Sequence, residues 1–391
     1  MVEDRPATPD VVYLDYNATA PLRPEALEAT LRALNSVGNA SSMHHMGRDA
    51  AARVDAARQQ LARLINCSPK EIIFTSGATE ANNLAIRAAY ARGGALVTTA
   101  VEHPAVLETA RIVTAGAEDS LIVLPVDGDG DLDLERLRDS LKGPVALVTT
   151  MLANNETGVL TDLEFIIEAA HEAGALVHTD ATQYVGRLPL DLAELDVDLL
   201  SLSAHKFGGP QGVGALFVRR GTPLPHQPLL LGGGHERGWR AGTLNVAGIV
   251  GLGAAAAAAR LKLQEEAVRI AKLRDELEAG LAARVPDCRI NGAASHRLPG
   301  VTSVTFPGVP ADALLAAMPM VAASDGSACS SGAPTPSHVL LAMGLTRDEA
   351  DSTLRFSLGY ATSGRDIERA IDAATYAVAQ VRAAMAATAG P

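Results

Sequence analysis

The segment LLSLSAHKFGG, residues 199–209, decides how the rest of the chain is interpreted. A short apolar run that ends in polar residues and a glycine turn is typical of a buried strand that delivers side chains to a loop. Lys206 follows this run directly, where an unpaired ammonium group would be costly to bury. Such a lysine can form an imine with a carbonyl compound, or it can simply extend to solvent from the strand end. The segment alone leaves both interpretations open.

The composition is that of a large globular protein. The chain has 391 residues, of which 48% are hydrophobic and 20% charged, so we expect a large core and two domains. The net charge of −12 argues against a nucleic-acid partner held by phosphate contacts. No segment is expected to approach the about 20 apolar residues of a membrane span, and the acidic N-terminal residues do not resemble a signal peptide. The odd number of cysteines, three, is typical of a reducing cytoplasm.

Apolar runs of strand length alternate with helical segments across residues 70–220. This alternation predicts an α/β fold in which helices sandwich a mainly parallel sheet. Polar segments follow the predicted strands that end near Phe74, Thr99, Leu152, His178 and Ser203. Because ligands bind beyond the carboxyl ends of such strands, these segments together predict one site.

A smaller α+β domain is expected after the sheet. One or two long helices are predicted over residues 251–285, and further strands and helices follow them. We expect a large domain over residues 14–257, and a small domain formed by residues 1–13 together with residues 258–391. The small domain contains Cys329 in a polar loop of small residues, 324–336.

The polar segments contain the groups that pyridoxal phosphate needs. Lys206 is the candidate for the imine, because the other four lysines lie at helix ends or on charged helix faces. Asp180 would keep the pyridine nitrogen protonated, so that the ring can accept electrons from a carbanion. His103 could stack on the ring or relay protons, although a lone histidine at a strand end often has a structural role.

The segment TSGATE, residues 75–80, lies between a predicted strand and a predicted helix. Such a turn can offer backbone N–H groups and hydroxyls to a phosphate, and Ser203 and His205 could add to them. The alternative is an ordinary helix cap made by Ser76 or Thr79. The segment lacks a full glycine-rich fingerprint, so both interpretations stay open.

The three cysteines differ in their surroundings. Cys67 and Cys288 neighbour apolar segments, and buried thiols react poorly. Cys329 lies among serines, where a thiol is expected to be exposed and able to move. On its own, Cys329 could also be an incidental loop thiol.

Taken together, the motifs resemble those of the NifS/IscS-like cysteine desulfurases, within the class V aminotransferases and the fold-type I pyridoxal-phosphate enzymes. The resemblance runs from about residue 13 to residue 359. The matching motifs are YLDYNATAP (13–21), TSGATE (75–80), EH (102–103), NNETG (154–158), HTDATQ (178–183), SAHK (203–206), GGGHERGWRAGT (232–243) and GSACSSG (326–332). The resemblance implies the fold-type I architecture, with a large cofactor-binding domain and a smaller one.

The resemblance also implies a role for each matching residue. Lys206 would carry the cofactor, Asp180 would pair with the pyridine nitrogen, Gln183 would bond to the phenolic oxygen, and His103 would stack on the ring. Asn155 would contact the cofactor and, with Arg355, hold the substrate carboxylate. The residues implied for the phosphate are Ala78, Thr79, Ser203, His205 and, from the neighbouring subunit of a homodimer, Thr243.

The implied activity is removal of sulfur from L-cysteine, which gives L-alanine and a persulfide on Cys329. A sulfur-acceptor protein such as an iron–sulfur scaffold would then receive the sulfur. Cys329 could also serve as a transient iron–sulfur cluster ligand, and no other metal ligand is implied. An aminotransferase, a selenocysteine lyase and a catalytically silent scaffold for sulfur-transfer proteins remain alternatives. The acceptor could also belong to tRNA thiolation or to DNA or cofactor sulfuration.

Two positions depart from the usual pattern of these enzymes. Ala40 replaces a common proline, and Asp325 replaces a more usual serine four residues before Cys329. A carboxylate near a thiol raises its pKa and slows its attack near neutral pH. We therefore expect Asp325 to affect the rate of sulfur transfer, and with it the choice of acceptor.

Overall fold

The computed structural model describes residues 11–117, 120–325 and 335–388. Its largest element is a seven-stranded sheet with the strand order β2-β8-β7-β6-β5-β3-β4. The strands are β2 (Ile72–Thr75), β3 (Ala95–Thr99), β4 (Leu121–Leu124), β5 (Val145–Met151), β6 (Leu176–Asp180), β7 (Leu199–Ser203) and β8 (Gly214–Val218). Strand β8 pairs antiparallel with both β2 and β7, whereas the other neighbours pair parallel. The predicted mainly parallel α/β sheet is confirmed, and β2 ends at the same edge as β3, β5, β6 and β7.

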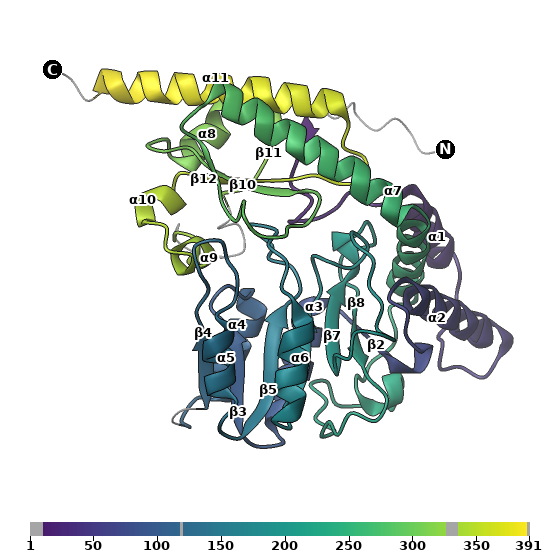
Figure 1. Cartoon of the computed structure of the whole chain (residues 1–391). Coiled ribbons are helices and arrows are strands. Elements are labelled where there is room, and N and C mark those ends of the chain that lie inside the picture. The colour runs from purple at the N-terminus through teal and green to yellow at the C-terminus, as the bar shows by residue number, and fades with distance from the viewer. Residues whose placement is uncertain (1–10, 118–119, 326–334, 389–391) are drawn as a thin grey trace.

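Helices cover both faces of this sheet (Figure 1). Alternate side chains of the strands belong to two different hydrophobic clusters, because successive residues of a strand point to opposite faces. Within β2, for example, Ile72 packs with one cluster and Ile73 with the other. The helices that cover the faces are α3 (Ala78–Tyr90), α4 (Pro104–Val113), α5 (Leu134–Ser140) and α6 (Leu163–Glu172).

A smaller group of strands and helices lies above the large sheet in Figure 1. It contains an antiparallel sheet of order β12-β10-β9 and a parallel pair formed by β1 and β11. The strands are β1 (Val12–Tyr13), β9 (Arg289–Ile290), β10 (Val301–Thr305), β11 (Val321–Ala322) and β12 (Thr353–Ser357). The helices are α8 (Ala311–Ala317), α9 (His338–Ala342), α10 (Arg347–Ala350) and α11 (Gly364–Thr388). Much of this group packs around its own hydrophobic cluster.

A single helix, α7 (Val246–Arg284), connects the two parts. Its first half contributes Ile249 and Leu252 to the core of the large sheet, and its second half contributes Leu273 and Leu277 to the smaller core. Helices α1 (Pro24–Leu34) and α2 (His45–Leu64) pack along the first half. The two cores therefore meet along one helix, and the exact boundary between the domains stays a prediction.

Helix α7 corrects the expectation that no segment approaches the length of a membrane span. Its most apolar stretch has a mean hydropathy of 1.5 and is long enough to cross a bilayer by length and composition alone. Half of that stretch is buried inside the protein. Its apolar character comes from valine, isoleucine, leucine and alanine, and its buried face packs into the core. Its glycines and alanines are small and let α1 and α2 approach closely, so a buried core helix explains the stretch.

Candidate active site

A cavity of about 390 Å³ opens at the carboxyl-end edge of the large sheet. This volume lies within the usual range for sites that bind small molecules. The cavity brings together most of the residues predicted for the site: Ala78, Thr79, His103, Asn155, Asp180, Gln183, Ser203, His205, Lys206 and Arg355. The predicted convergence of the polar segments is therefore what the fold produces, because the strands that carry them end at one edge.

The two remaining predicted residues are Thr243 and Cys329. Thr243 is exposed on the segment before α7 and does not line this cavity of its own chain. Cys329, with the rest of residues 326–334, lies outside the described residues.

The turn of residues 75–79, called the phosphate turn after its predicted role, leads from β2 into α3. Gly77 occupies the N-cap of α3, and no described side chain caps this helix. The alternative in which Ser76 or Thr79 caps the helix is therefore wrong. Glu80 turns back and accepts a hydrogen bond of 2.8 Å from the Ser76 N–H, which fixes the turn. An uncapped helix N-terminus that faces a cavity offers its N–H groups and its positive dipole end to an anion.

Asp180 ends β6 and is only 6% exposed. Its Oδ2 accepts a hydrogen bond of 2.6 Å from Asn82 Nδ2, and its Oδ1 accepts one of 2.9 Å from the Thr182 N–H. The two donors fix the orientation of the carboxylate at the wall of the cavity. Asn82 was not predicted, although an asparagine on the buried face of a helix otherwise lined by Ala78, Ala81 and Ala85 is a usable signal.

A buried histidine supports Asp180 from within the sheet. His178 lies two residues earlier on β6, so it points to the same face of the strand. Its ring nitrogens lie 2.7 Å from Thr149 Oγ1 and 2.9 Å from Ser201 Oγ, which joins β6 to both of its neighbours. Burial lowers the pKa of His178 to about 4, so the ring is neutral at physiological pH.

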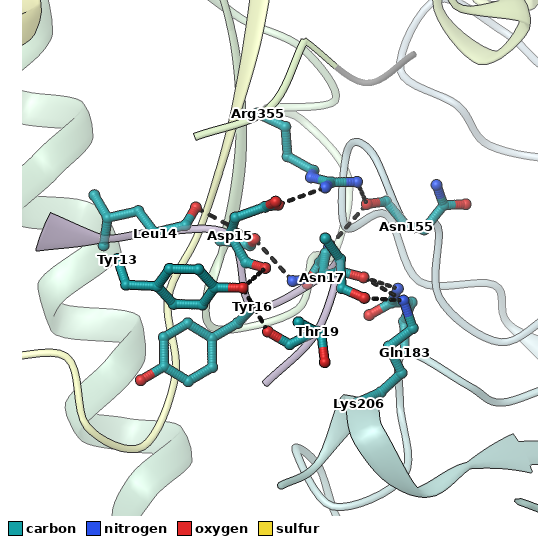
Figure 2. Close-up of polar contacts among 12 residues, drawn as sticks. Tyr13, Leu14, Asp15, Tyr16, Asn17, Thr19, Asn155, Gln183, Lys206 and Arg355 are labelled. Carbon is teal, nitrogen blue, oxygen red and sulfur yellow. Dashed lines mark hydrogen bonds and ion pairs between the residues drawn. The ribbon is translucent and has the colours of Figure 1, made fainter. Parts of the chain in front are cut away.

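The Lys206 side chain turns into the cavity (Figure 2). It lies at the end of the short 3-10 turn Ala204–Lys206 that follows β7. Its Nζ donates hydrogen bonds to the carbonyl oxygens of Asn17, at 2.5 Å, and Ala18, at 2.9 Å. The interpretation in which this lysine extends to solvent is therefore wrong. Asn17 and Ala18, which hold the amine, are far from Lys206 in the sequence, so no local pattern could reveal this contact.

Two histidines line the cavity in a neutral state. His103 caps α4, since its Nδ1 accepts a hydrogen bond of 3.0 Å from the Ala105 N–H, so its Nε2 carries the ring proton. Burial is the largest cause that lowers its pKa. His205 Nδ1 lies 3.2 Å from Thr19 Oγ1, and burial together with Lys206 and Arg187 lowers its pKa to about 4. His103 therefore has the structural role that was considered for it, and it also faces the cavity.

Arg355 and Asn155 also line the cavity. Arg355 comes from β12 of the small sheet and is 4% exposed. Its guanidinium donates hydrogen bonds to Asp15 Oδ1, at 2.7 Å, and to the Asn155 carbonyl, at 3.0 Å (Figure 2). Its Nε has no hydrogen-bond partner within the described chain. A buried guanidinium with donor capacity left over is suited to bind a carboxylate.

Glu102, which precedes His103, is fully buried behind the site. Its Oε1 accepts hydrogen bonds from Thr99 Oγ1, at 2.9 Å, and from the Met151 N–H, at 2.7 Å. Burial, with a smaller contribution from the nearby Asp180 charge, raises its pKa to about 8. The EH motif therefore contributes an acid that carries a proton at neutral pH, which sequence reasoning did not predict.

Cys67 and Cys288 lie in surroundings that do not favour a reactive thiolate. Burial raises the pKa of Cys67 to about 12 and also raises that of Cys288, which agrees with poor reactivity.

Asp325 lies near enough to the buried Glu156 to help raise the pKa of Glu156, although burial is the larger cause. Glu156 accepts a hydrogen bond from Ser337, so the flanks of residues 326–334 meet at one buried carboxyl. Among the described residues, no group of three or more His, Cys, Asp and Glu side chains could hold a metal ion.

Comparison with known proteins identifies the family. Residues 12–370 match the model of the class-V aminotransferase family. Over 366 residues the chain is 44% identical to the cysteine desulfurase IscS of Anaeromyxobacter dehalogenans, an alignment that covers 92% of the chain and 90% of that protein. It is 46% identical to a cysteine desulfurase of Cereibacter sphaeroides, with 95% and 97% covered. The crystal structure of a NifS-like protein from Rickettsia africae superposes with a TM-score of 0.83 at 33% identity, with 93% and 98% covered.

The fold is the fold-type I architecture of pyridoxal-phosphate enzymes. The chain belongs to the class-V aminotransferase family and, within it, to the cysteine desulfurases. The resemblance found in the motifs is confirmed.

The residues that line the cavity fit pyridoxal phosphate. A fixed carboxylate at Asp180, an inward-facing amine at Lys206 and an uncapped helix N-terminus at Gly77 match the ring nitrogen, aldehyde and phosphate of this group. Two buried side-chain oxygens in the same wall, Asn82 Oδ1 and Gln183 Oε1, have no hydrogen-bond partner within the described chain. Buried polar atoms without partners are rare in a protein, so these two indicate a polar occupant.

Proposed function

We propose that the chain removes sulfur from L-cysteine and leaves L-alanine and a persulfide on Cys329. The observation that carries this proposal is that the Lys206 amine, the Asp180 carboxylate and the Arg355 guanidinium all line one cavity. The first pair suits a cofactor that stabilises a carbanion, and Arg355 suits the carboxylate of an amino acid. Pyridoxal phosphate, when bound, supplies the electron sink that such a carbanion needs.

Different residues of the chain bind the substrate, transfer its proton and hold the cofactor. Arg355 and Asn155 bind the substrate carboxylate, which places the Cα hydrogen toward Lys206. Lys206 Nζ takes this proton and later returns one. With pyridoxal phosphate bound, Asp180 would hold a proton on the ring nitrogen, Gln183 would bond to the phenolic oxygen, and His103 would contact the ring. The residues that would hold the phosphate are Ala78, Thr79, Ser203 and His205.

The sulfur step is a displacement at sulfur. The Cys329 thiolate forms a bond to the substrate sulfur, and the bond between that sulfur and the substrate Cβ breaks. The electron pair stays with carbon, which takes up a proton and becomes the methyl group of alanine. The sulfur is oxidised and the carbon reduced, so no external oxidant is needed for this turnover.

The test is to measure alanine and sulfide released from L-cysteine in the presence of a reductant. Wild-type protein should form both products, and Lys206→Ala should form neither. Borohydride treatment should fix pyridoxal phosphate covalently on the peptide that contains Lys206. Transfer of the amino group to pyruvate would instead favour an aminotransferase, and a strong preference for selenocysteine would favour a selenocysteine lyase. Absence of any borohydride product would favour the catalytically silent scaffold.

The chain is further proposed to act as a cytoplasmic homodimer. Large apolar side chains are highly exposed near the ends of α1 and α2 and before α7, among them Val37 at 79%, Met43 at 90% and Leu231 at 83%. A partner subunit would cover such side chains, and exposed Thr243 could then reach the partner's phosphate. The thiols of Cys67 and Cys288 are free, which is consistent with a reducing compartment.

The persulfide on Cys329 would be passed to an acceptor protein, for which an iron–sulfur scaffold is the first candidate. Incubation of the enzyme, labelled with sulfur-35 cysteine, with candidate acceptors would identify the protein that takes the label.

A further inference from the structure

Asn17 is the most highly connected polar residue of the site, yet the proposed function gives it no role. It is 1% exposed and lies in the turn that follows β1. Its hydrogen-bond partners, visible in part in Figure 2, are Ser357 Oγ, the Asn155 carbonyl, Arg187, Gln183 Nε2 and Lys206 Nζ. These partners come from the small sheet and from three of the loops at the edge of the large sheet, so Asn17 connects both halves of the protein.

The backbone and the side chain of Asn17 contact different partners. Its carbonyl oxygen accepts hydrogen bonds from Lys206 Nζ, at 2.5 Å, and from Gln183 Nε2, at 3.1 Å. Its side-chain Nδ2 donates a hydrogen bond of 2.8 Å to the Asn155 carbonyl. That same carbonyl also accepts a hydrogen bond from Arg355. Asn17 therefore spans the distance between the amine that moves protons and the groups that hold the substrate carboxylate.

A partly buried arginine, Arg187, holds Asn17 in this orientation. Arg187 donates hydrogen bonds to Asn17 Oδ1, to the Tyr16 carbonyl at 3.2 Å and to the Lys206 carbonyl at 3.3 Å. A buried guanidinium is costly unless oxygens satisfy its donors, so these three oxygens are held tightly around it. The backbone of Lys206 and the side chain of Asn17 are thereby fixed to the same rigid group.

We propose that Asn17 is a positioning residue that holds the Lys206 amine whenever this amine is not bonded to the cofactor, and keeps it aligned with the carboxylate site at Arg355. This inference rests on the proposed function and deepens it. During turnover the amine must stay within reach of the substrate Cα. A misplacement of about 1 Å can cost about 100-fold in rate, so a fixed resting place for the amine affects catalysis directly.

Two substitutions of Asn17 distinguish its side-chain contact with the Asn155 carbonyl from its side-chain contact with Arg187. Asn17→Asp keeps an oxygen for Arg187 but loses the donor to the Asn155 carbonyl, so it should mainly raise KM for L-cysteine. Asn17→Ala loses both contacts and frees the turn, so it should also lower kcat by about 10- to 100-fold. Asn291→Ala is the matched control, because Asn291 also makes two side-chain hydrogen bonds, to Ser303 and Thr305, but lies outside the cavity.

A structural role alone would lower the melting temperature without changing the chemistry of Lys206. The decisive readout is therefore the rate at which pyridoxal phosphate, added to cofactor-free protein, becomes attached to Lys206, followed by its visible absorption. Asn17→Ala should slow this attachment at least about fivefold, while Asn291→Ala leaves it unchanged at a similar loss of stability.

An attachment rate and a kcat per bound cofactor equal to those of the wild type, in folded Asn17→Ala, would overturn the inference. If wild-type protein attaches the cofactor but yields no alanine from cysteine, the proposed function fails. The attachment rates still decide the role of Asn17 in that case.

Discussion

Asn82 Nδ2 lies 2.6 Å from Asp180 Oδ2, although the two residues are 98 positions apart in the sequence. Both are buried, and the hydrogen bond ties the first turns of α3 to the end of β6. The helix whose N-terminus is proposed to bind the phosphate therefore also fixes the carboxylate proposed to face the ring nitrogen. One helix thus sets the distance between the two ends of the cofactor site.

The first prediction concerns this contact. Asn82→Ala should weaken the affinity for pyridoxal phosphate by about 10- to 100-fold, because a hydrogen bond to a charged group contributes about 1.5 to 3 kcal/mol. Cofactor titration of the cofactor-free protein measures the change. Asn83→Ala is the control, since the neighbouring Asn83 bonds only to the Thr79 carbonyl of its own helix. Equal affinities for the Asn82 variant and the wild type would show that the contact does not orient Asp180.

The second prediction concerns Gly214, at the start of β8. A Cβ atom at this position would lie 2.5 Å from the Leu202 carbonyl oxygen and 2.7 Å from the Gly77 Cα, both of them backbone atoms that cannot turn away. Gly214→Ala should therefore displace the phosphate turn, lower stability by about 1 to 3 kcal/mol and weaken cofactor binding. Urea unfolding and cofactor titration measure both effects.

Gly143→Ala is the matched control for Gly214, because a Cβ at Gly143 meets no atom within 4 Å. Loss of stability with unchanged cofactor affinity would show that Gly214 matters for the sheet but not for the phosphate turn.

The third prediction concerns Glu102 and pH. Its pKa is about 8 in the folded protein, against an ordinary value of 4.5, so between these values the folded state holds a proton that the unfolded state has lost. The free energy of unfolding of the wild type should therefore fall as pH rises, by about 1 kcal/mol per pH unit from this group. Glu102→Gln keeps the acceptor for Thr99 and Met151 but removes the titration, so its stability relative to the wild type should grow from pH 5 to about pH 8.

Urea unfolding at several pH values measures this difference. Glu108→Gln, which changes an exposed glutamate of α4, should run parallel to the wild type. A difference between Glu102→Gln and the wild type that does not change with pH would mean that Glu102 is ionised in the folded protein.

Much of the fold and the site could be predicted because the signals are local. The strand that precedes Lys206 and the one that contains Asp180 are each marked by an apolar run with a polar residue at its end. Parallel strands end at one edge, so the convergence of such residues follows from the order of the elements alone. The length of α7 could not be predicted in this way, because an alanine-rich stretch does not show whether one helix or two will form.

The residues that were missed depend on tertiary contacts. Asn17 and Arg187 are both polar residues in turns, and polar turn residues are usually expected to be exposed to solvent. Asn17 is buried and Arg187 partly buried in the folded protein, where the two side chains bond to each other across 170 positions of sequence. The raised pKa of Glu102 could not be predicted from the EH motif. It comes from complete burial behind β5 and not from the neighbours of Glu102 in the sequence. Burial of this kind has no local pattern.

The central claim is that sulfur leaves L-cysteine and becomes bound to Cys329. The most direct test is a single turnover with L-cysteine, followed by peptide mass spectrometry without reductant, in wild-type protein and in Cys329→Ser. Cys67→Ser and Cys288→Ser serve as controls, because burial raises the pKa of both of these thiols. We predict that the peptide with Cys329 gains the mass of one sulfur atom, together with one alanine per active site, and that only Cys329→Ser loses both. Alanine formed by Cys329→Ser at the wild-type rate, or the added sulfur found on Cys67 or Cys288, would contradict the account.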